Sequence, residues 1–251
     1  MFKIAVISAN GGIGRTTLTA HLASLLARRD QSVVALDFDP NNLLSLHFGL
    51  PSTETDGLAL RAARGQPWQD AAFSNADGIT FLPFGVPQDS ERTHFGTRIS
   101  REPLWLSEQI DRINLSSSSI ALIDTPRLPS VFAQQAIDAA DLILGIVAAD
   151  ASSYAKLPSL QNVIKLSGKM NKAFYVVNYA DSARRLHNDI ITLMQNDLGD
   201  RLLPYFVHHD EAVPESLAAN SSLADYAPHG QATHDLQGLV SWLLSRVATN
   251  R

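Results

Sequence analysis

Short apolar runs recur along the chain, and segments with helical periodicity fill most of the gaps between them. The runs cover residues 3–8, 32–37, 79–83, 119–124, 142–147, 173–178 and 202–207. Apolar runs of this length, bounded by turn residues, are typical of strands that are buried on both faces. Helices between such strands favour right-handed crossovers. The pattern therefore predicts an α/β fold: a doubly wound, mostly parallel sheet of seven or eight strands with helices on both faces.

Two further segments are interpreted from their polar positions. The last helical segment, 236–247, has an apolar stripe that includes Trp242, but Arg246 is its only basic residue. Helices that lie in a membrane surface normally add several Lys and Arg residues, so we expect this helix to pack on the outer face of the sheet. The stretch 83–97 is rich in turn residues, which predicts a loop.

Composition favours one domain and narrows the chemistry. A chain of 251 residues with 45% hydrophobic content can bury one large core, and no linker-like tract divides it. We therefore expect a single domain over residues 1–251. The absence of cysteine excludes disulfides and iron–sulfur ligation. Because the longest apolar run, 142–149, is too short to span a bilayer, we expect a cytoplasmic protein.

A glycine-rich segment lies between the first predicted strand and the first predicted helix, and it reads Asn-Gly-Gly-Ile-Gly-Arg-Thr-Thr. Its glycines allow the backbone to wrap an anion, so that successive N–H groups and the helix N-terminus face one phosphate chain. An ordinary glycine-rich turn is the alternative. The strand before it and the helix after it favour nucleotide binding, with the Thr16 hydroxyl on Mg²⁺. The predicted contacts are Asn10, Gly11, Gly12, Ile13, Gly14, Arg15, Thr16 and Thr17.

Two positions of this segment depart from the usual phosphate loop. Arg15 stands where lysine is usual, and Asn10 stands where a deviant form of the loop has a second lysine. Arginine keeps the positive charge but is bulkier and prefers a planar, forked contact. Nucleotide binding is thus expected, whereas fast phosphoryl transfer is less assured.

Carboxylates follow two of the later apolar runs. Asp37 and Asp39 end the run at 33–40, and Asp124 ends the run at 120–126. In open α/β folds the carboxyl ends of the strands meet at one edge, where a bound Mg-nucleotide lies. Each acid by itself could be a helix cap or a turn residue. All three acids end apolar runs that follow a phosphate loop, and this arrangement favours a common site.

These three segments resemble the MinD/ParA class of P-loop ATPases, whose loop reads Lys-Gly-Gly-x-Gly-Lys-Thr-Thr. The resemblance implies that Asp39 positions the attacking water, with Arg15 as the catalytic cation, and that Asp37 and Asp124 act around Mg²⁺ through water. It also implies an ATP-sandwich homodimer, in which the lysine at position 10 would reach the partner's phosphates. Asn10 brings no charge there.

The same resemblance places an adenine pocket late in the chain. Asn178 ends the run at 173–178, and an amide can read the base edge because it carries a donor and an acceptor. The loop after the last strand, with Pro204, His209 and Asp210, would close over the ring. Alternatively, Asn178 simply terminates its strand. Adjacent His208 and His209 point to opposite faces if extended, so a metal site is not expected there.

Four looser segments, 39–44, 65–70, 82–85 and 209–212, are similar to the BcsQ (YhjQ) family of cellulose-biosynthesis proteins within that class. This resemblance implies an ATP-dependent accessory subunit of the bacterial cellulose secretion machinery. It also implies a small BcsR-like partner and recruitment to the synthase at the inner membrane through partner proteins, without direct membrane insertion.

Charge weighs against the DNA-segregating members of the class. The formal net charge is −5, and the segment 210–251 holds five acids against Arg246 and Arg251. Because DNA binding requires a positive surface, we expect no nucleic-acid partner. Three hypotheses stay open: a nucleotide-gated assembly factor, a partition or positioning ATPase, and a non-hydrolysing nucleotide-bound scaffold.

Overall fold

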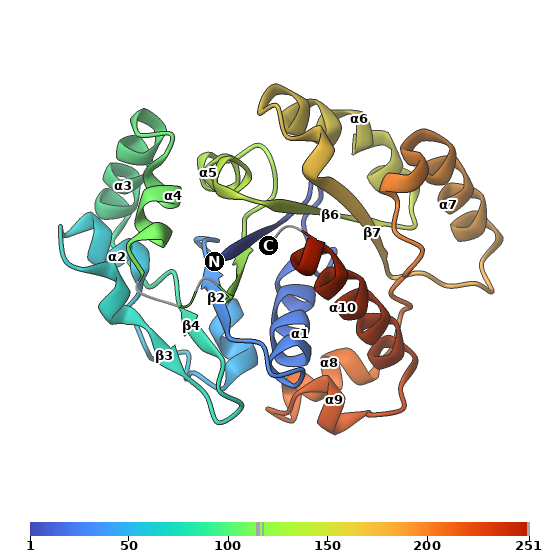
Figure 1. Ribbon diagram of the computed structural model, residues 1–251, viewed down its shortest axis with the longest axis horizontal. Coiled ribbons are helices and arrows are strands. Elements are labelled where there is room, and N and C mark those ends of the chain that lie inside the picture. Colours follow the sequence, from blue (N-terminus) through green and yellow to red (C-terminus); the bar gives the residue numbers. More distant parts are fainter. Residues whose placement is uncertain (114–115, 117, 250–251) are drawn as a thin grey trace.

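The computed structural model describes residues 1–113, 116 and 118–249, and a seven-stranded sheet runs through its centre (Figure 1). The strands are β1 (Phe2–Ile7), β2 (Val33–Asp37), β3 (Phe73–Ser74), β4 (Thr80–Leu82), β5 (Ile120–Asp124), β6 (Leu142–Ala148) and β7 (Ala173–Asn178). Their order is β3-β4-β2-β5-β1-β6-β7. All neighbours are parallel except β3 and β4. The predicted doubly wound, mostly parallel sheet is confirmed.

Helices cover both faces of this sheet (Figure 1). One face carries α2 (Leu58–Ala63), α3 (Asp89–Arg101), α4 (Trp105–Asp111), α5 (Val131–Ala139), α6 (Ala151–Leu166) and α7 (Arg185–Leu198). The other carries α1 (Arg15–Ala27), α8 (Ala212–Ala218), α9 (Leu223–Tyr226) and α10 (Gln231–Thr249). In the described part of the chain, four 3₁₀ helices lie in connections: η1 (Leu44–Phe48), η2 (Trp68–Ala71), η3 (Met170–Lys172) and η4 (Gly199–Arg201).

The central strands are apolar on both sides because each side meets a separate hydrophobic cluster. In β1, Ala5 and Ile7 pack in the cluster under α5, while Ile4 and Val6 pack in the cluster under α1. Successive side chains of a strand point to opposite faces, so a strand covered on both faces must be apolar throughout. This is why continuous apolar runs, rather than alternating ones, predicted the sheet.

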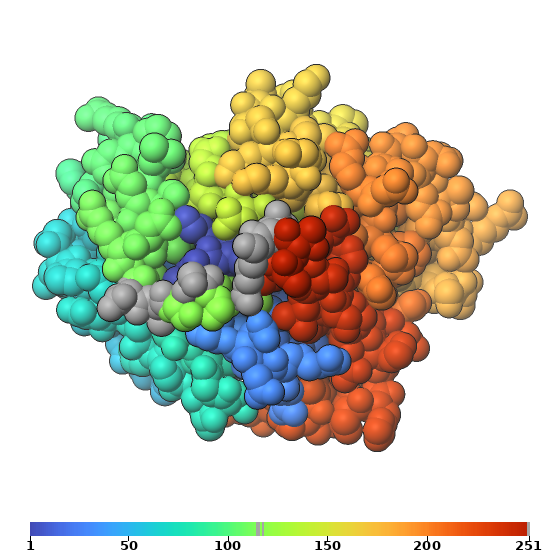
Figure 2. All heavy atoms as spheres, viewed as in Figure 1, coloured from blue at the N-terminus to red at the C-terminus, as the bar shows by residue number. Residues whose placement is uncertain are grey.

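The C-terminal helix α10 packs on the sheet as expected. Its apolar stripe, which includes Leu236, Leu239 and Leu243, is buried in the cluster that it shares with α1. Figure 2 shows α10 in red beside the blue surface of the N-terminal segment. Among the described residues, no helix has the length and apolar character that a membrane span requires. Arg251, which was counted in the charge of this segment, lies outside the described residues.

The predicted strand at 202–207 is wrong in detail. The segment runs beside β7, and the N–H groups of Leu203 and Val207 donate to the carbonyls of Tyr175 and Val177 at 2.8 Å each. It forms an isolated bridge at Leu202, and a second one follows at His208, rather than a continuous ladder. Pro204 has no N–H to donate, and proline within an apolar run disfavours regular pairing. The seventh strand is instead β3, whose two residues are too few to form a recognisable run.

The loop predicted at 83–97 is also wrong, because α3 begins at Asp89. The Glu91 side chain accepts a hydrogen bond from the backbone N–H of Gln88 at 2.8 Å. Asp89 and Glu91 both lie in the first turn, where carboxylates favour the positive end of the helix dipole. These helix-start signals outweigh the turn residues that precede them.

Candidate functional site

The loop between β1 and α1 has the geometry of an anion cradle. Gly12 and Gly14 have φ angles of 70° and 82°, in the left-handed region that side chains rarely adopt. In the described part of the chain, the backbone N–H groups of residues 11–14 donate no hydrogen bond. Helix α1 starts directly after Gly14, so its N-terminus adds partial positive charge. The glycines therefore leave a row of amide donors open to an anion.

Asn178, at the end of β7, holds this loop from one side. Its Nδ2 donates a hydrogen bond to the carbonyl of Ile13 at 2.8 Å, and the residue is buried. A Cβ on Gly14 would lie 2.4 Å from the Asn178 Nδ2. Asn178 therefore ends its strand and also contacts the phosphate loop. Glycine is required at position 14 both for its backbone conformation and for space.

Two carboxylates meet at the carboxyl edge of the sheet. Asp37 and Asp124 are register partners at the ends of β2 and β5. The Thr16 hydroxyl donates to the Asp124 Oδ2 at 2.6 Å, whereas the Asp124 Oδ1 is buried without a hydrogen-bond partner. Burial raises the pKa of Asp124 to about 7 and also raises that of Asp37, where the nearby Asp124 adds to the effect. The pair concentrates negative charge that a cation would stabilise.

Asp37 also has a structural role. Its two carboxylate oxygens accept hydrogen bonds from the backbone N–H groups of Asp39, at 3.1 Å, and Leu44, at 2.9 Å. These bonds shape the turn after β2 and place Asp39 near the phosphate loop. Asp37 is thus both a turn residue, as the alternative interpretation expected, and a neighbour of Asp124.

Arg15 is folded into the protein rather than extended toward solvent. Its Nη1 donates to the Ser8 hydroxyl at 2.6 Å, and its Nη2 lies 3.6 Å from the Asp39 Oδ2. The two charged side chains are 10% and 6% exposed. Burial lowers the pKa of Arg15, while Asp124 and Asp39 oppose that change. The Arg15 Nε is buried without a partner. The cation of the loop is thus held against Asp39, the carboxylate that we predict to position the attacking water.

Asn10 is directed into its own chain. Its Nδ2 donates to the hydroxyls of Ser152, at 3.3 Å, and Ser153, at 3.2 Å, in the first turn of α6. The Asn10 Oδ1 is buried without a hydrogen-bond partner. These contacts anchor the start of the phosphate loop to α6, and they direct the amide away from solvent.

A cavity of about 450 Å³ continues from the phosphate loop toward α8. Gly12, Gly14 and Thr17 line one end, and Asn178, His209 and Asp210 line another part. This volume lies in the range of small-molecule sites. The structure therefore brings these predicted residues together. Pro204 is exposed and is not part of this lining.

His21, His47 and Tyr179 are among the residues of this cavity that sequence reasoning missed. Tyr179 has a φ angle of 57°, an unusual conformation for a bulky residue, and its ring centroid lies 5.9 Å from that of His209. A positive φ leaves no signal in the sequence at tyrosine. His21 stands at a buried position among the apolar residues of α1, which is the one signal that was available.

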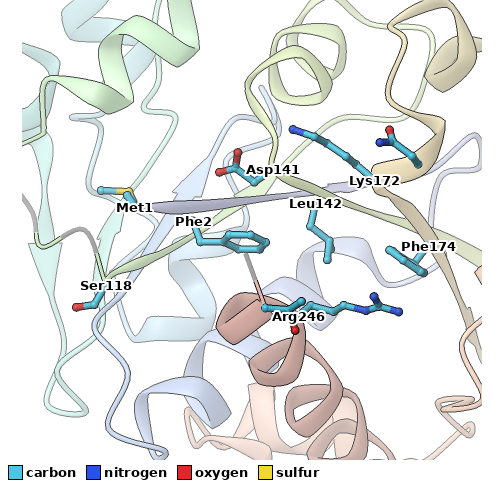
Figure 3. A pocket seen from close by; sticks show the side chains of 10 residues that line it. Met1, Phe2, Ser118, Asp141, Leu142, Lys172, Phe174 and Arg246 are labelled. Carbon is cyan, nitrogen blue, oxygen red and sulfur yellow. The ribbon is translucent and has the colours of Figure 1, made fainter. Parts of the chain in front are cut away.

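A larger cavity, of about 710 Å³, lies at the opposite edge of the sheet (Figure 3). It is lined by residues that include Phe2, Asp141, Phe174 and Arg246. These residues lie near the amino ends of β1, β6 and β7 and near the end of α10. Ligands of doubly wound sheets bind at the carboxyl ends of the strands, so this cavity is not the candidate nucleotide site.

Comparison with known proteins agrees with this geometry. The profile of the family described as "Cellulose biosynthesis protein BcsQ" matches residues 1–244. The chain belongs to the BcsQ family. The BcsQ protein of Escherichia coli K12 is 29% identical over 248 residues, which are 97% of this chain and 94% of that protein. The family resemblance seen in the sequence is confirmed.

More distant relatives of this BcsQ family chain lie in the MinD/ParA class. The chromosome-partitioning ATPase Soj of Thermus thermophilus is 22% identical over 98% of this chain and 96% of its own. The septum site-determining protein MinD of Pyrococcus horikoshii, solved as a complex with Mg-ADP, superposes with a TM-score of 0.78 at 20% identity. That match covers 97% of this chain and 96% of MinD. At this identity the match shows a shared fold.

Acid is expected to destabilise this BcsQ family protein through His21 and His47, whose ring centroids lie 5.8 Å apart. Burial lowers the pKa of His21 to about 3, with His47 adding to the effect, and burial lowers the pKa of His47 to about 4. The unfolded chain binds protons at these positions below about pH 6.5, whereas the folded chain binds them only near pH 3 to 4. Each histidine therefore costs about 2 kcal/mol of folding stability between neutral pH and pH 5.

Urea unfolding at neutral pH and near pH 5 measures this effect. We expect His21→Gln to lose about 2 kcal/mol less stability on acidification than the wild type. Asp37 and Asp124 have raised pKa values and change stability in the opposite direction, but their effect cancels in the comparison of the two proteins. An identical loss in both proteins would show that His21 is not held neutral by burial.

Proposed function

We propose that this protein binds Mg-ATP at the phosphate loop and that ATP joins two copies of the chain. As a dimer it would act as an accessory subunit of the bacterial cellulose synthase secretion system. The observation that carries the proposal is the cradle of open amides at residues 11–14, which stands beside the Thr16–Asp124 pair. Family membership supports the role in cellulose biosynthesis.

The residues beside the loop fit a magnesium ion. Thr16 would bind it through its hydroxyl, and Asp37 and Asp124 would hold its water molecules. The Asp124 Oδ1 has no hydrogen-bond partner and the pKa of this carboxyl is raised, and both features fit a carboxyl group that interacts with a bound cation. The metal would neutralise charge on the nucleotide's phosphates. Solved structures of similar fold, such as the MinD complex with Mg-ADP, support this assignment.

The cavity next to the loop fits the nucleoside. Asn178, His209 and Asp210 line it together with the phosphate-loop glycines, so phosphates in the cradle would place the base beside these side chains. The amide of Asn178 and the carboxylate of Asp210 offer hydrogen-bonding groups for adenine. Pro204 stays a predicted base contact, although it is exposed and does not line this cavity.

Slow hydrolysis is part of the proposal. Asp39 would orient the attacking water, but in this structure it lies against Arg15, which also bonds Ser8. A phosphate bound by Arg15 would compete with these two contacts for the guanidinium. A bulky guanidinium that has alternative bonds within the protein is a less mobile phosphate ligand than lysine. We therefore expect bound ATP to stay on the protein for a long time, with little hydrolysis.

Dimerisation is expected to depend on ATP and to be limited by Asn10. Light scattering should show the mass of a monomer without nucleotide and an increase in mass with Mg-ATP. The Asn10 amide is neutral and is hydrogen-bonded to Ser152 and Ser153 in its own chain, so it contributes no charge across the interface. Asn10→Lys should strengthen the ATP-dependent dimer by about tenfold, as expected for one added charge-assisted contact. A wild-type protein that stays monomeric when saturated with ATP would contradict the proposal.

We further propose that the dimer works with a small BcsR-like partner and with synthase components at the inner membrane, to which partner proteins recruit it. A partition or positioning ATPase is the second candidate, supported by the likeness to Soj. The formal net charge of −5 is unfavourable for binding to DNA. Phosphate release measured with and without duplex DNA, or with anionic lipid vesicles, separates the two. Strong stimulation by either one would favour the second candidate.

A further inference from the structure

Arg127 lies at the rim of the phosphate loop, although the loop motif does not include it. It follows β5 by three residues, and its neighbour Leu128 donates a backbone hydrogen bond to the carbonyl of Ser8 at 2.9 Å. This bond ties the segment after β5 to the end of β1. A Cβ on Gly11 would lie 3.8 Å from the Arg127 Cδ. The stem of the arginine therefore passes directly beside the glycines of the cradle.

The guanidinium of Arg127 has no protein partner among the residues that the structure describes: no hydrogen bond or ion pair engages it. The residue is exposed. Arg15 differs in each respect, because it is buried and bonds Ser8 and Asp39. An unengaged cation beside open amide donors is a group that can bind an anion without first breaking another contact.

Arg127 and Arg15 are also close enough to affect each other. Burial is the largest cause of the lowered pKa of Arg15, and Asp124 and Asp39 oppose it. The positive charge of Arg127 lowers this pKa further. Two like charges near one glycine loop repel each other, and an anion between them relieves that repulsion. The loop thus has two cations nearby although its own sequence supplies one.

A second cation matters at this loop because the residue at position 10, Asn10, carries no charge. The amide of Asn10 is neutral, and its Nδ2 is hydrogen-bonded to the hydroxyls of Ser152 and Ser153. We propose that Arg127 binds the terminal phosphate of the nucleotide held by its own phosphate loop and supplies the positive charge that Asn10 lacks. This inference rests on the proposed binding of ATP. It adds a nucleotide-binding residue outside the loop motif.

The inference predicts a specific change in nucleotide preference. A contact to the terminal phosphate of ATP strengthens ATP binding and leaves ADP binding nearly unchanged. A charge-assisted contact at an accessible site accounts for about a tenfold change in affinity. Calorimetric titration of Arg127→Gln with Mg-ATP and Mg-ADP should therefore show ATP binding about tenfold weaker than in the wild type. ADP affinity should stay within about twofold.

Matched variants separate this contact from general effects. Arg101→Gln removes the same charge at an exposed position at the end of α3, and it should leave both affinities unchanged. Arg127→Lys keeps the charge and should retain most of the ATP affinity. Adding Asn10→Lys to Arg127→Gln should restore part of the lost affinity, because in the ATP-bound dimer it returns a cation to the phosphates from the partner chain. Thermal unfolding of each variant reports whether the fold is intact.

Each outcome decides one question. Equal ATP affinity in Arg127→Gln and in the wild type would overturn the inference, and so would an equal loss of ATP and ADP affinity. A wild-type protein that binds neither nucleotide would instead overturn the proposed function itself. A loss that is confined to ATP, restored by Arg127→Lys and absent in Arg101→Gln, would establish Arg127 as a terminal-phosphate ligand.

Discussion

Gly14→Val is expected to weaken ATP binding by more than about a hundredfold, which corresponds to about 2.7 kcal/mol. The Cβ of any other residue at this position would lie 2.4 Å from the Asn178 Nδ2 and 3.4 Å from the Tyr179 hydroxyl oxygen. The backbone at Gly14 also has a φ angle of 82°, which valine adopts only with strain. Either response, a shift of Asn178 or a change of the loop, disturbs the amide row that would hold the phosphates.

Gly168→Val is the matched control for this experiment. Gly168 has a φ angle of 70°, and a Cβ there would meet no atom within 4 Å. The control therefore has a similar backbone strain without the contact at the site. Calorimetry should show wild-type ATP affinity for Gly168→Val and none measurable for Gly14→Val, while urea unfolding shows that both variants are folded. Unchanged ATP affinity in Gly14→Val would refute the assignment of the loop.

Asp39→Ala is expected to lower the rate of ATP hydrolysis by at least about a hundredfold while ATP binding and the ATP-bound dimer persist. Asp39 is the carboxylate assigned to the attacking water. Its removal also releases Arg15 from its 3.6 Å contact, so ATP affinity should be equal or higher. Asp39→Asn tests the same step with less disturbance of the turn, because an amide oxygen can still accept from the backbone N–H of Asn41. Phosphate release that survives both changes would exclude the water-positioning role.

Arg15→Lys distinguishes two reasons for slow turnover. If the bonds of the guanidinium to Ser8 and Asp39 restrain an otherwise competent site, lysine should speed hydrolysis. If other required groups are missing, lysine should leave the rate unchanged. Single-turnover phosphate release with saturating ATP measures the effect directly. The variant keeps the charge, so a change in rate reports geometry rather than electrostatics.

The fold and the loop could be predicted from local sequence patterns. Buried strands such as β5 and β6 are apolar runs, and the glycines of the cradle mark their own backbone conformation. The segment at 202–207 is also apolar, and only its pairing beside β7 shows that it is not a regular strand. An apolar pattern indicates burial, but it does not indicate which backbone N–H and C=O groups form the hydrogen bonds of a strand.

The electrostatic details depended on contacts between distant parts of the chain. Asn10 is held by serines more than a hundred residues away, and Arg127 reaches the loop only because β1 and β5 are neighbours. His21 and His47 meet across the connection between α1 and η1. No local motif encodes these contacts. Sequence reasoning therefore predicted the residues of the loop but missed the cation beside it and the histidines of the cavity.

Nucleotide retention by the purified protein tests the central claim most directly. The protein is incubated with Mg-ATP, separated from free nucleotide by gel filtration with in-line light scattering, and denatured so that released nucleotide can be quantified by mass spectrometry over time. The account predicts a peak with the mass of a dimer, containing about one nucleotide per chain, most of it still ATP at early times. A peak with the mass of a monomer and no bound nucleotide would contradict it.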